Sequence, residues 1–287
     1  MKSLFSKGIV LLALATSIVS CKKNSDVLPQ SDINVVNSAT LGKYLTNKNG
    51  QTLYIFANDA DGTVSCTGAC ANLWPPVTVD LLSALKFDTS LLATDFTVVA
   101  AADGKNHLAY KGWPLYTHSP LNASNTNVAE ATGAITGDGF NGLWFVAKPD
   151  YTVMFANKQL TGLDGNNYKG DYTVGTGNTT YFTNGYGFTL YTFSVDSFNI
   201  NKFTKPDLSN YATFPLYEPN QIVAPSILDK TLFGSITVAG HKQFTYNGWP
   251  LYFYGLDNAV RGSNKAVSFP VPGKWKVAVK DITSAPR

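Results

Sequence analysis

The chain has 287 residues, of which 44% are hydrophobic, 13% aromatic and 14% charged. This apolar content is enough for a large core in one or two domains, and the many Tyr, Phe and Gly residues favour an all-β protein over a helical one. The formal net charge is +3 without a basic run. This balance lacks the electrostatic footprint of a nucleic-acid-binding protein, so we expect no nucleic-acid partner.

Residues 1–20 have the pattern of a secretory signal peptide. Lys2 and Lys7 give a positive start, and the apolar run that follows is too short to span a bilayer. The run ends in Ile18-Val19-Ser20-Cys21, which resembles the lipobox of bacterial lipoproteins. In that family the peptide is cut before the Cys, which becomes the lipidated first residue. The resemblance implies lipidation at Cys21 and attachment to a membrane; an ordinary signal peptide is the alternative.

Residues 21–39 are polar and show no clear period, so we interpret them as a tether after the lipidated Cys. Lys22 stands where an Asp would signal retention in the inner membrane of some bacteria. We therefore expect a lipid-anchored protein of the cell envelope, placed at the outer membrane. The periplasmic and the surface face both remain open.

Two further cysteines, Cys66 and Cys70, frame the sequence Cys-Thr-Gly-Ala-Cys. Outside the cytoplasm an isolated pair is by default a disulfide, and closing so small a loop stabilises a fold by only about 2 kcal/mol. Soft thiolates with an imidazole also suit copper or zinc. A metal or redox site built from Cys66, Cys70 and His118 is therefore the alternative, but we favour the disulfide and expect no cofactor.

One short pattern, a Gly, any residue, Thr or Pro, and then Leu-Tyr, occurs four times. The copies are Gly50 to Tyr54, Gly112 to Tyr116, Gly187 to Tyr191 and Gly248 to Tyr252. Alternating segments flank each copy, which predicts a β-hairpin with Gly at a positive φ in its turn. A third strand is expected before most hairpins, including one at Tyr172 to Val174. A fourth is expected after a long loop, including one from Leu73 into Val77.

The chain therefore divides into four units of about four antiparallel strands. Units one and three share Thr-Leu-Tyr, while units two and four share Trp-Pro-Leu-Tyr, which indicates two pseudo-symmetric halves at 40–149 and 150–287. We predict an all-β, propeller-like fold in which four sheets bury their faces on one another. Two tandem β-sandwich or barrel domains are the alternative. Residues 149–171 form either an extra hairpin or the joint between the halves.

Three units carry Tyr, any residue, an aromatic residue, two further residues and Asp. These are Tyr54–Phe56–Asp59, Tyr191–Phe193–Asp196 and Tyr252–Tyr254–Asp257. The motif resembles that of predicted bacterial lipoproteins named for Tyr-x-aromatic-x-x-Asp, which are also described as secreted repeats of unknown function. The resemblance covers most of residues 40–280 and implies an envelope lipoprotein with no assigned activity. Unit two departs from the pattern, with His118 at the aromatic position and Leu121 at the Asp position.

The motif residues have a structural interpretation. An Asp just after a strand can accept backbone N–H bonds and fix a turn. A Tyr and an aromatic residue two positions apart lie on one face of a strand and pack together. We find no nucleophile elbow, phosphate-binding Gly loop or carboxylate pair recognisable as acid and base. No residue is therefore assigned to catalysis or to a metal.

These features predict a lipid-anchored envelope module of unknown biochemical role that binds or supports an envelope polymer or protein without catalysis. Enzymatic activity is left open, although the repeat favours a non-enzyme. The alternatives are a metal-binding or redox lipoprotein and, third, an enzyme that acts on envelope glycans.

Overall fold

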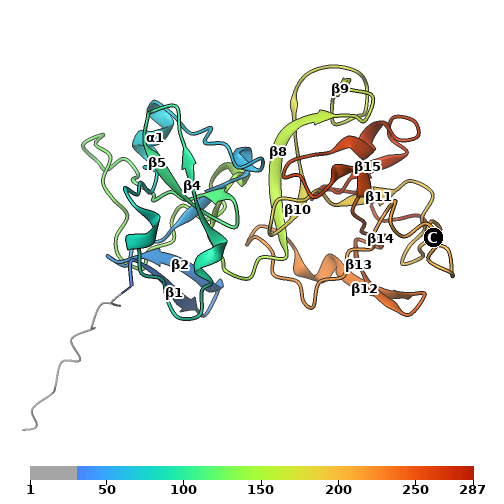
Figure 1. Ribbon diagram of the computed structural model, residues 1–287, viewed down its shortest axis with the longest axis horizontal. Coiled ribbons are helices and arrows are strands. Elements are labelled where there is room, and N and C mark those ends of the chain that lie inside the picture. Colours follow the sequence, from blue (N-terminus) through green and yellow to red (C-terminus); the bar gives the residue numbers. More distant parts are fainter. Residues whose placement is uncertain (1–30) are drawn as a thin grey trace, which may run out of the picture.

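The computed structural model describes residues 31–287, which form short antiparallel strands in six small sheets (Figure 1). The expected signal peptide, Cys21 and most of the tether lie outside these residues. Within residues 31–287 the sheets have two or three strands, and none closes into a barrel. The prediction of an all-β protein is therefore confirmed. No helix in this part of the chain is long and apolar enough to cross a membrane.

Seven strands make up the first half. β1 (Ile33–Ser38) pairs with β2 (Gly42–Asn47), β3 (Tyr54–Phe56) pairs with β7 (Trp144–Val146), and β4 (Phe96–Ala100), β5 (Asn106–Tyr110) and β6 (Trp113–Pro114) form one sheet. The short helices are α1 (Ala69–Leu73) and the 3-10 turns η1 (Ala57–Asp59), η2 (Leu82–Ala84), η3 (Ala93–Asp95) and η4 (Phe140–Gly142). β1 lies within the range assigned to the tether. That range is corrected, because the N–H groups of Asp32 and Ile33 bond to Lys86 and Ile33 is buried.

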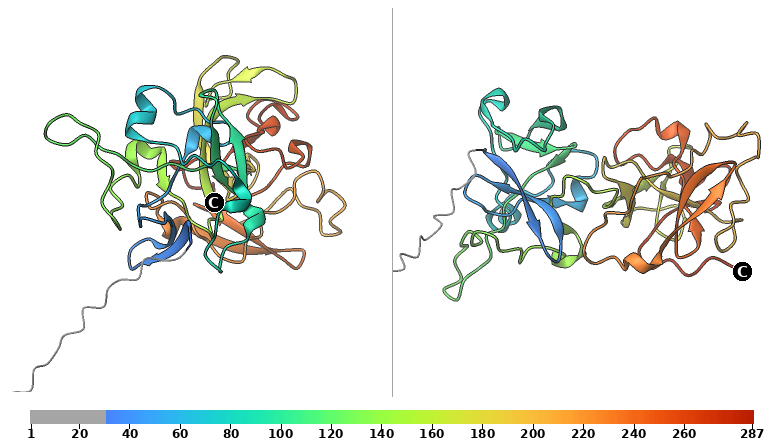
Figure 2. Two further views of the ribbon diagram at one scale, coloured as in Figure 1. Left: turned by 60° about the vertical axis from the view of Figure 1, so that its left-hand side comes forward. Right: turned by 90° about the horizontal axis from the view of Figure 1, so that it is seen from below.

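The second half repeats this order and adds one strand, β9 (Asn167–Tyr168). β8 (Val153–Thr161) pairs with β9 and β10 (Asn178–Asn184), β11 (Tyr191–Phe193) pairs with β15 (Trp275–Val277), and β12 (Phe233–Val238), β13 (His241–Tyr246) and β14 (Trp249–Pro250) form one sheet. The 3-10 turns are η5 (Lys230–Leu232), η6 (Gly255–Asp257) and η7 (Lys265–Ser268). The two halves lie side by side in Figure 1 and in the right panel of Figure 2. Their boundary at residues 149 and 150 stays a prediction.

The turns of the repeat follow the expected glycine chemistry. Tyr110 pairs with Trp113 across a two-residue loop in which Lys111 has a φ of 48° and Gly112 a φ of 77°. Two positive φ angles in a two-residue loop match the right-handed twist of the flanking strands. Asn247 and Gly248 form the equivalent loop between β13 and β14.

The units are not self-contained four-stranded sheets, and a propeller is not confirmed. β7 belongs by sequence to unit two, but it pairs with β3 of unit one. In the same way, β15 of unit four pairs with β11 of unit three. Each of these strands is only three residues long. The two units of each half are thus interleaved.

Two of the predicted strands, at Tyr172 to Val174 and from Leu73 into Val77, do not form as expected. Val153–Thr161, within the range expected to be an insertion, is the partner of β10. Tyr172 and Thr173 instead lie in a turn, because Oδ1 of Asp171 accepts the backbone N–H and hydroxyl of Thr173, and Tyr172 has a φ of 67°. Val174 forms an isolated β-bridge with Tyr168. Leu73 ends helix α1 rather than beginning a strand.

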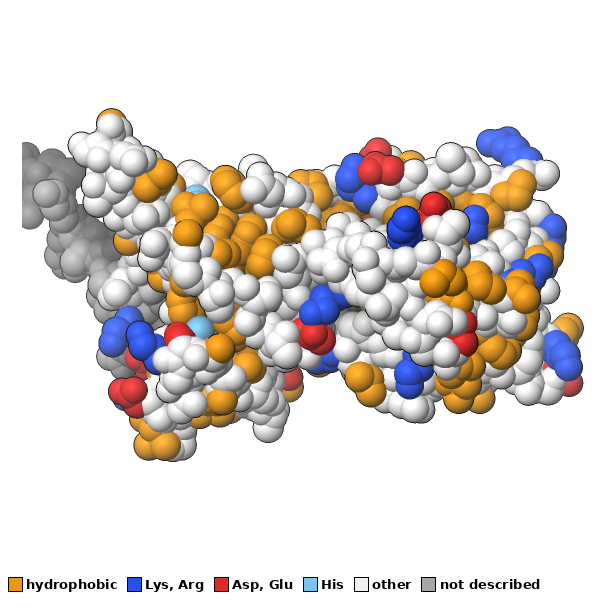
Figure 3. Space-filling view, turned by 90° about the horizontal axis from the view of Figure 1, so that it is seen from above, with side chains coloured by type: hydrophobic (Ala, Val, Ile, Leu, Met, Phe, Trp, Pro, Cys, Tyr) orange, Lys and Arg blue, Asp and Glu red, His pale blue; other side chains and the backbone are white. Residues whose placement is uncertain are grey.

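The halves share buried contacts. Nε1 of Trp113 donates to the carbonyl of Gly185 at 2.9 Å. The guanidinium of Arg261 lies 4.7 Å from the centre of the Trp113 ring and donates to the carbonyls of Lys111 and Tyr186. One hydrophobic core contains residues of both halves, while a second, smaller core lies within the first half. On the face shown in Figure 3, acidic and basic side chains are interspersed among uncharged ones.

Candidate functional site

The tyrosines of the four Leu-Tyr copies are buried, and each hydroxyl donates to a carboxylate. The pairs are Tyr54 with Oε2 of Glu130 (2.7 Å), Tyr116 with Oδ2 of Asp59 (2.5 Å), Tyr191 with Oδ2 of Asp257 (2.6 Å) and Tyr252 with Oδ2 of Asp196 (2.8 Å). In every pair the tyrosine and the acid come from different units of the same half. The two units of a half therefore exchange hydrogen bonds reciprocally.

Backbone pairing places these side chains. The N–H of Tyr54 donates to the carbonyl of Tyr116, and the N–H of Tyr116 donates back to the carbonyl of Tyr54. Tyr191 and Tyr252 form the same reciprocal pair in the second half. Because the paired strands are antiparallel, each ring passes the partner strand and reaches the loop that follows it.

The second carboxylate oxygen of each motif Asp accepts hydrogen bonds from the loop that follows the Asp in the chain. Oδ1 of Asp59 accepts the backbone N–H of Ser65 at 2.9 Å and also its hydroxyl. Oδ1 of Asp196 accepts the N–H of Lys202 at 2.8 Å. Oδ1 of Asp257 accepts the hydroxyl of Ser263 at 2.7 Å and the N–H of Lys265 at 2.9 Å. Each Asp thus joins a loop to a tyrosine of the neighbouring unit.

Unit two uses Glu130, which sequence reasoning missed. Leu121, which follows Tyr116 at the motif spacing, is exposed in a loop. Oε1 of Glu130 accepts the N–H and the hydroxyl of Thr136, which lies six positions later, as Ser65 lies six after Asp59. This spacing to a hydroxyl residue is the signal that could have found it, since Glu130 is one of only two Glu residues in the chain.

The buried acids differ in pKa. Burial raises the pKa of the Asp59 carboxyl to about 6 and that of Asp196 to about 6, and it also raises the pKa of Asp257. Burial acts on Glu130 in the same direction, but the hydrogen bonds that it accepts outweigh this effect and lower its pKa. Burial also raises the pKa of each paired tyrosine well above its ordinary value, so its hydroxyl remains a donor.

Each half holds a column of four stacked rings beside its tyrosine pairs. In the first half the column is Phe56, Trp144, Trp74 and His118, with successive centroid distances of 4.1, 3.9 and 4.3 Å. In the second half it is Phe193, Trp275, Phe214 and Tyr254, with distances of 4.4, 3.4 and 4.7 Å. His118 therefore takes the position of an aromatic ring in the core, where Trp74 stacks on it.

The imidazole of His118 also has one nitrogen near the Glu130 carboxylate. Its Nδ1 lies 3.2 Å from the hydroxyl of Thr136 and 3.7 Å from Oε1 of Glu130. Its Nε2 is buried and has no hydrogen-bond partner among the described residues. The imidazole thus packs as a ring and contacts the Glu130 loop with one nitrogen.

Cys66 and Cys70 form a disulfide, as predicted. Cys66 is buried in the small core of the first half, together with Trp74 and Trp144. At the equivalent point after Asp196, Phe203 packs edge-on against Trp275 instead. The disulfide thus occupies core space that a ring fills in the second half. Across residues 31–287, no three His, Cys, Asp or Glu residues gather as a candidate metal site.

Residues 35–78 match the model of a protein family described as a secreted repeat of unknown function. The chain carries a repeat of this family. The match covers the residues of the first Tyr-x-aromatic-x-x-Asp motif and the disulfide, and it confirms the family resemblance over residues 35–78. The resemblance of the other units stays a prediction. A secreted repeat agrees with an extracellular or envelope location. Comparison with curated proteins and with solved structures gave no match.

Proposed function

We propose that this protein is a lipid-anchored module of the cell envelope that binds an envelope component and catalyses no reaction. Support comes from the secreted repeat at residues 35–78, the lipobox that ends in Cys21, and the disulfide between Cys66 and Cys70. Disulfides persist in extracytoplasmic compartments. We place the anchor at the outer membrane because Lys22 follows Cys21.

The observation that carries the proposal is that the carboxylates of the repeat units are buried and form hydrogen bonds inside the protein. All four acids are buried, and each accepts hydrogen bonds from a tyrosine hydroxyl and from a backbone N–H of a loop. They are Asp59, Glu130, Asp196 and Asp257. A general acid or base must reach a proton of the substrate. Carboxylates held inside the core in this way serve the scaffold, so the recurring motif supports a binding body rather than a reaction centre.

The binding claim is tested with residues 22–287 secreted to an oxidising compartment. The purified protein is mixed with peptidoglycan sacculi and with outer-membrane vesicles, and the bound fraction and any soluble products are measured. We expect retention on at least one of these fractions with no release of fragments. Release of products by wild-type protein, at a rate that the Asp59→Asn variant lowers, would show that the motif acid is catalytic and would contradict the proposal.

The anchor is tested separately on the full chain. We expect metabolic labelling with a fatty acid to modify wild-type protein and not Cys21→Ser, and the variant to leave the membrane fraction. Labelling of the variant at wild-type level would contradict lipidation at Cys21.

A metal-binding or redox lipoprotein that uses Cys66, Cys70 and His118 is the second candidate, favoured by the buried, unpaired Nε2 of His118. It requires the disulfide to open, because a thiolate and not a disulfide is the metal ligand. Intact mass and metal content of the secreted protein separate the two. We expect a mass two hydrogens below the reduced value and no metal, whereas a reduced pair with stoichiometric copper or zinc would favour the second candidate. An enzyme that acts on glycans ranks third.

A further inference from the structure

The second half carries a hollow lined by aromatic rings, which we call the aromatic cleft. It consists of two adjoining hollows of about 280 and 420 Å³ that share Asn184, Pro215 and Phe253. Phe188 lines the first hollow, and Tyr186 and Tyr211 line the second. We propose that the aromatic cleft binds a neutral glycan chain. This inference rests on the proposed binding function and names its site and ligand class.

Three aromatic residues of the cleft have no aromatic counterpart in the first half. Aligning Tyr54 with Tyr191 places Asn49 at the position of Tyr186 and Gln51 at that of Phe188. Aligning Tyr116 with Tyr252 places Thr117 at the position of Phe253. The first half forms the same strands with these smaller polar residues. The strand pattern that the two halves share therefore does not require aromatic residues at these three positions, and the side chain of Tyr186 is 47% exposed.

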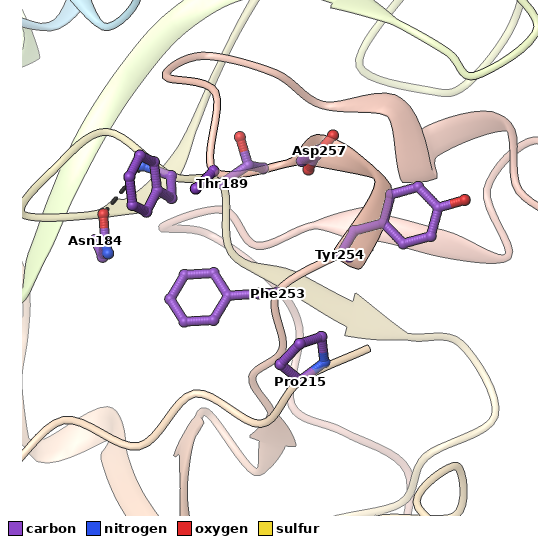
Figure 4. Close-up of a pocket in the computed structure, with 9 residues that line it drawn as sticks. Asn184, Thr189, Pro215, Phe253, Tyr254 and Asp257 are labelled. Atoms are coloured by element: carbon purple, nitrogen blue, oxygen red, sulfur yellow. Dashed lines mark hydrogen bonds between the residues drawn. The ribbon is translucent and has the colours of Figure 1, made fainter. Parts of the chain in front are cut away.

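The side-chain amide of Asn184 has a free donor, because Phe188 stands where the first half has Gln51. In the first half, Oδ1 of Asn47 accepts the N–H of Gln51, and Nδ2 of Asn47 donates to Oε1 of Gln51 at 2.9 Å. In the second half, Oδ1 of Asn184 accepts the N–H of Phe188 at 3.0 Å. Phe188 offers no side-chain oxygen, and Nδ2 of Asn184 finds no acceptor among residues 31–287. In Figure 4 the ring of Phe253 points toward Asn184.

Glu218 lines the second hollow and supplies an acceptor there. Its Oε1 accepts the hydroxyl of Tyr211 at 2.7 Å, and its Oε2 lies 3.0 Å from Nδ1 of His241. Its side chain remains 27% exposed. The cleft therefore presents aromatic rings together with an amide donor and a carboxylate acceptor.

This combination fits a sugar chain. A pyranose ring has apolar C–H faces that pack on aromatic rings, and its hydroxyls can pair with an amide and a carboxylate at its edges. Neither hollow is lined by Lys or Arg in the described part of the chain, which disfavours phosphate-rich and other anionic ligands. The rings line a hollow rather than a protruding edge, which disfavours insertion into a lipid surface.

The cleft is built to hold the chain without cutting it. Asp257, which lines the first hollow, uses both oxygens on Tyr191, Ser263 and Lys265. Glycoside hydrolysis needs one carboxyl free to protonate the leaving oxygen and a second to activate water or attack. Glu218 alone cannot fill both roles.

The test uses variants that place first-half residues in the cleft. Phe188→Gln returns an acceptor to Asn184, and Phe253→Thr copies Thr117. Phe253 packs against the core and edge-on against Tyr217, so Phe253→Thr is expected to lower the Tm while the protein stays folded, and thermal unfolding of both variants checks this. Val174→Thr, at an exposed position that lines neither hollow, is the matched control. Residues 22–287 are titrated calorimetrically with tetrasaccharides of N-acetylglucosamine, glucose, xylose and mannose. We expect at least one to bind wild type and the control equally, and each cleft variant at least about tenfold more weakly, because buried ring contacts dominate such sites.

The outcomes separate the site from the general function. Sacculi bound equally by wild type and both cleft variants, with no tetrasaccharide bound, would overturn the glycan cleft and leave the binding function standing. No retention on sacculi or outer-membrane vesicles and no tetrasaccharide binding would overturn both. Binding to vesicles of phosphatidylethanolamine and phosphatidylglycerol that is lost in Phe253→Thr would also overturn the glycan assignment, in favour of a lipid surface.

Discussion

The hydroxyl of Tyr116 donates to Oδ2 of Asp59 at 2.5 Å, and both residues are fully buried. Asp59 belongs to the first repeat unit, while Tyr116 belongs to the second. Tyr54 returns the contact by donating to Glu130 of unit two. Each unit therefore donates a tyrosine hydroxyl to the carboxylate of the other, so neither buried carboxylate has its full set of hydrogen bonds unless both units are present. The smallest complete body is therefore a pair of units.

Removal of one hydroxyl tests this dependence. In Tyr116→Phe, the buried Asp59 loses one of its donors, so we expect a loss of about 1.5–3 kcal/mol in the free energy of unfolding. Urea denaturation of residues 22–287 measures it. Tyr186→Phe, at an exposed tyrosine, is the control and should change stability by less than about 0.5 kcal/mol. Equal effects of the two variants would contradict a specific Tyr116–Asp59 bond.

Glu130 is expected to be as important as the aspartates of the motif. Glu130→Ala leaves the hydroxyl of Tyr54 and the N–H of Thr136 without their acceptor, so we expect a loss of about 2–4 kcal/mol by urea denaturation. Glu218→Ala removes the only other Glu of the chain, which is partly exposed, and should cost less than about 1 kcal/mol. A Glu130 variant as stable as the Glu218 variant would remove Glu130 from the set of structural acids.

The sequence showed the repeat, the hairpin turns and the disulfide, because each depends on residues that are close in the chain. Gly112 and Gly248 mark their turns directly, and Cys66 and Cys70 lie four positions apart. The pairing between units could not be predicted from the sequence, because β3 and β7 are three-residue strands with helix α1 and the whole β4–β6 sheet between them in the chain. Nothing in their periodicity specifies which strand pairs with which.

The candidate site shows the same limit. The spacing from Tyr54 to Asp59 recurs in three units and was found, but the acid that each tyrosine contacts belongs to another unit. Glu130 was hidden by an insertion and by a change of residue type. His118 was singled out as unusual, yet its stacking on Trp74 depends on a loop brought in from unit one.

The raised pKa of the aspartates predicts an unusual pH dependence. An Asp whose pKa is raised to about 6 in the folded protein binds its proton more tightly there than in the unfolded chain. Its contribution to stability is complete below the unfolded pKa, near 4, and is lost as pH rises through about 6. Asp257 acts in the same direction. We therefore expect the free energy of unfolding to fall as pH rises from about 4.5 to 7.

Urea denaturation at fixed ionic strength across that interval measures the slope, and Asp59→Asn should flatten it. Glu130 has a lowered pKa, so its contribution is lost only as pH falls through its folded pKa, below this interval. A stability that increases with pH between 4.5 and 7 would contradict the protonation behaviour assigned to Asp59 and Asp196.

The disulfide is expected to be a local staple. Its loop is so short that removing it by Cys66→Ala with Cys70→Ala should lower the free energy of unfolding by about 2 kcal/mol, without loss of the fold. Tyr116→Phe is the comparison, because it should lower the free energy of unfolding by a similar amount although it breaks no covalent bond. A Cys66/Cys70 variant that is unfolded at 25 °C by circular dichroism would give the disulfide a much larger role.

The central claim is that tyrosine–carboxylate bonds join the two units of each half. A double-mutant cycle on Tyr116→Phe and Asp59→Ala, measured by urea denaturation at pH 7, tests it most directly. We predict a coupling energy of at least about 1 kcal/mol, because each single change removes the same buried bond. Single-variant losses that add to the double-variant loss, with a coupling energy near zero, would show that Tyr116 and Asp59 stabilise the protein independently and would contradict the account.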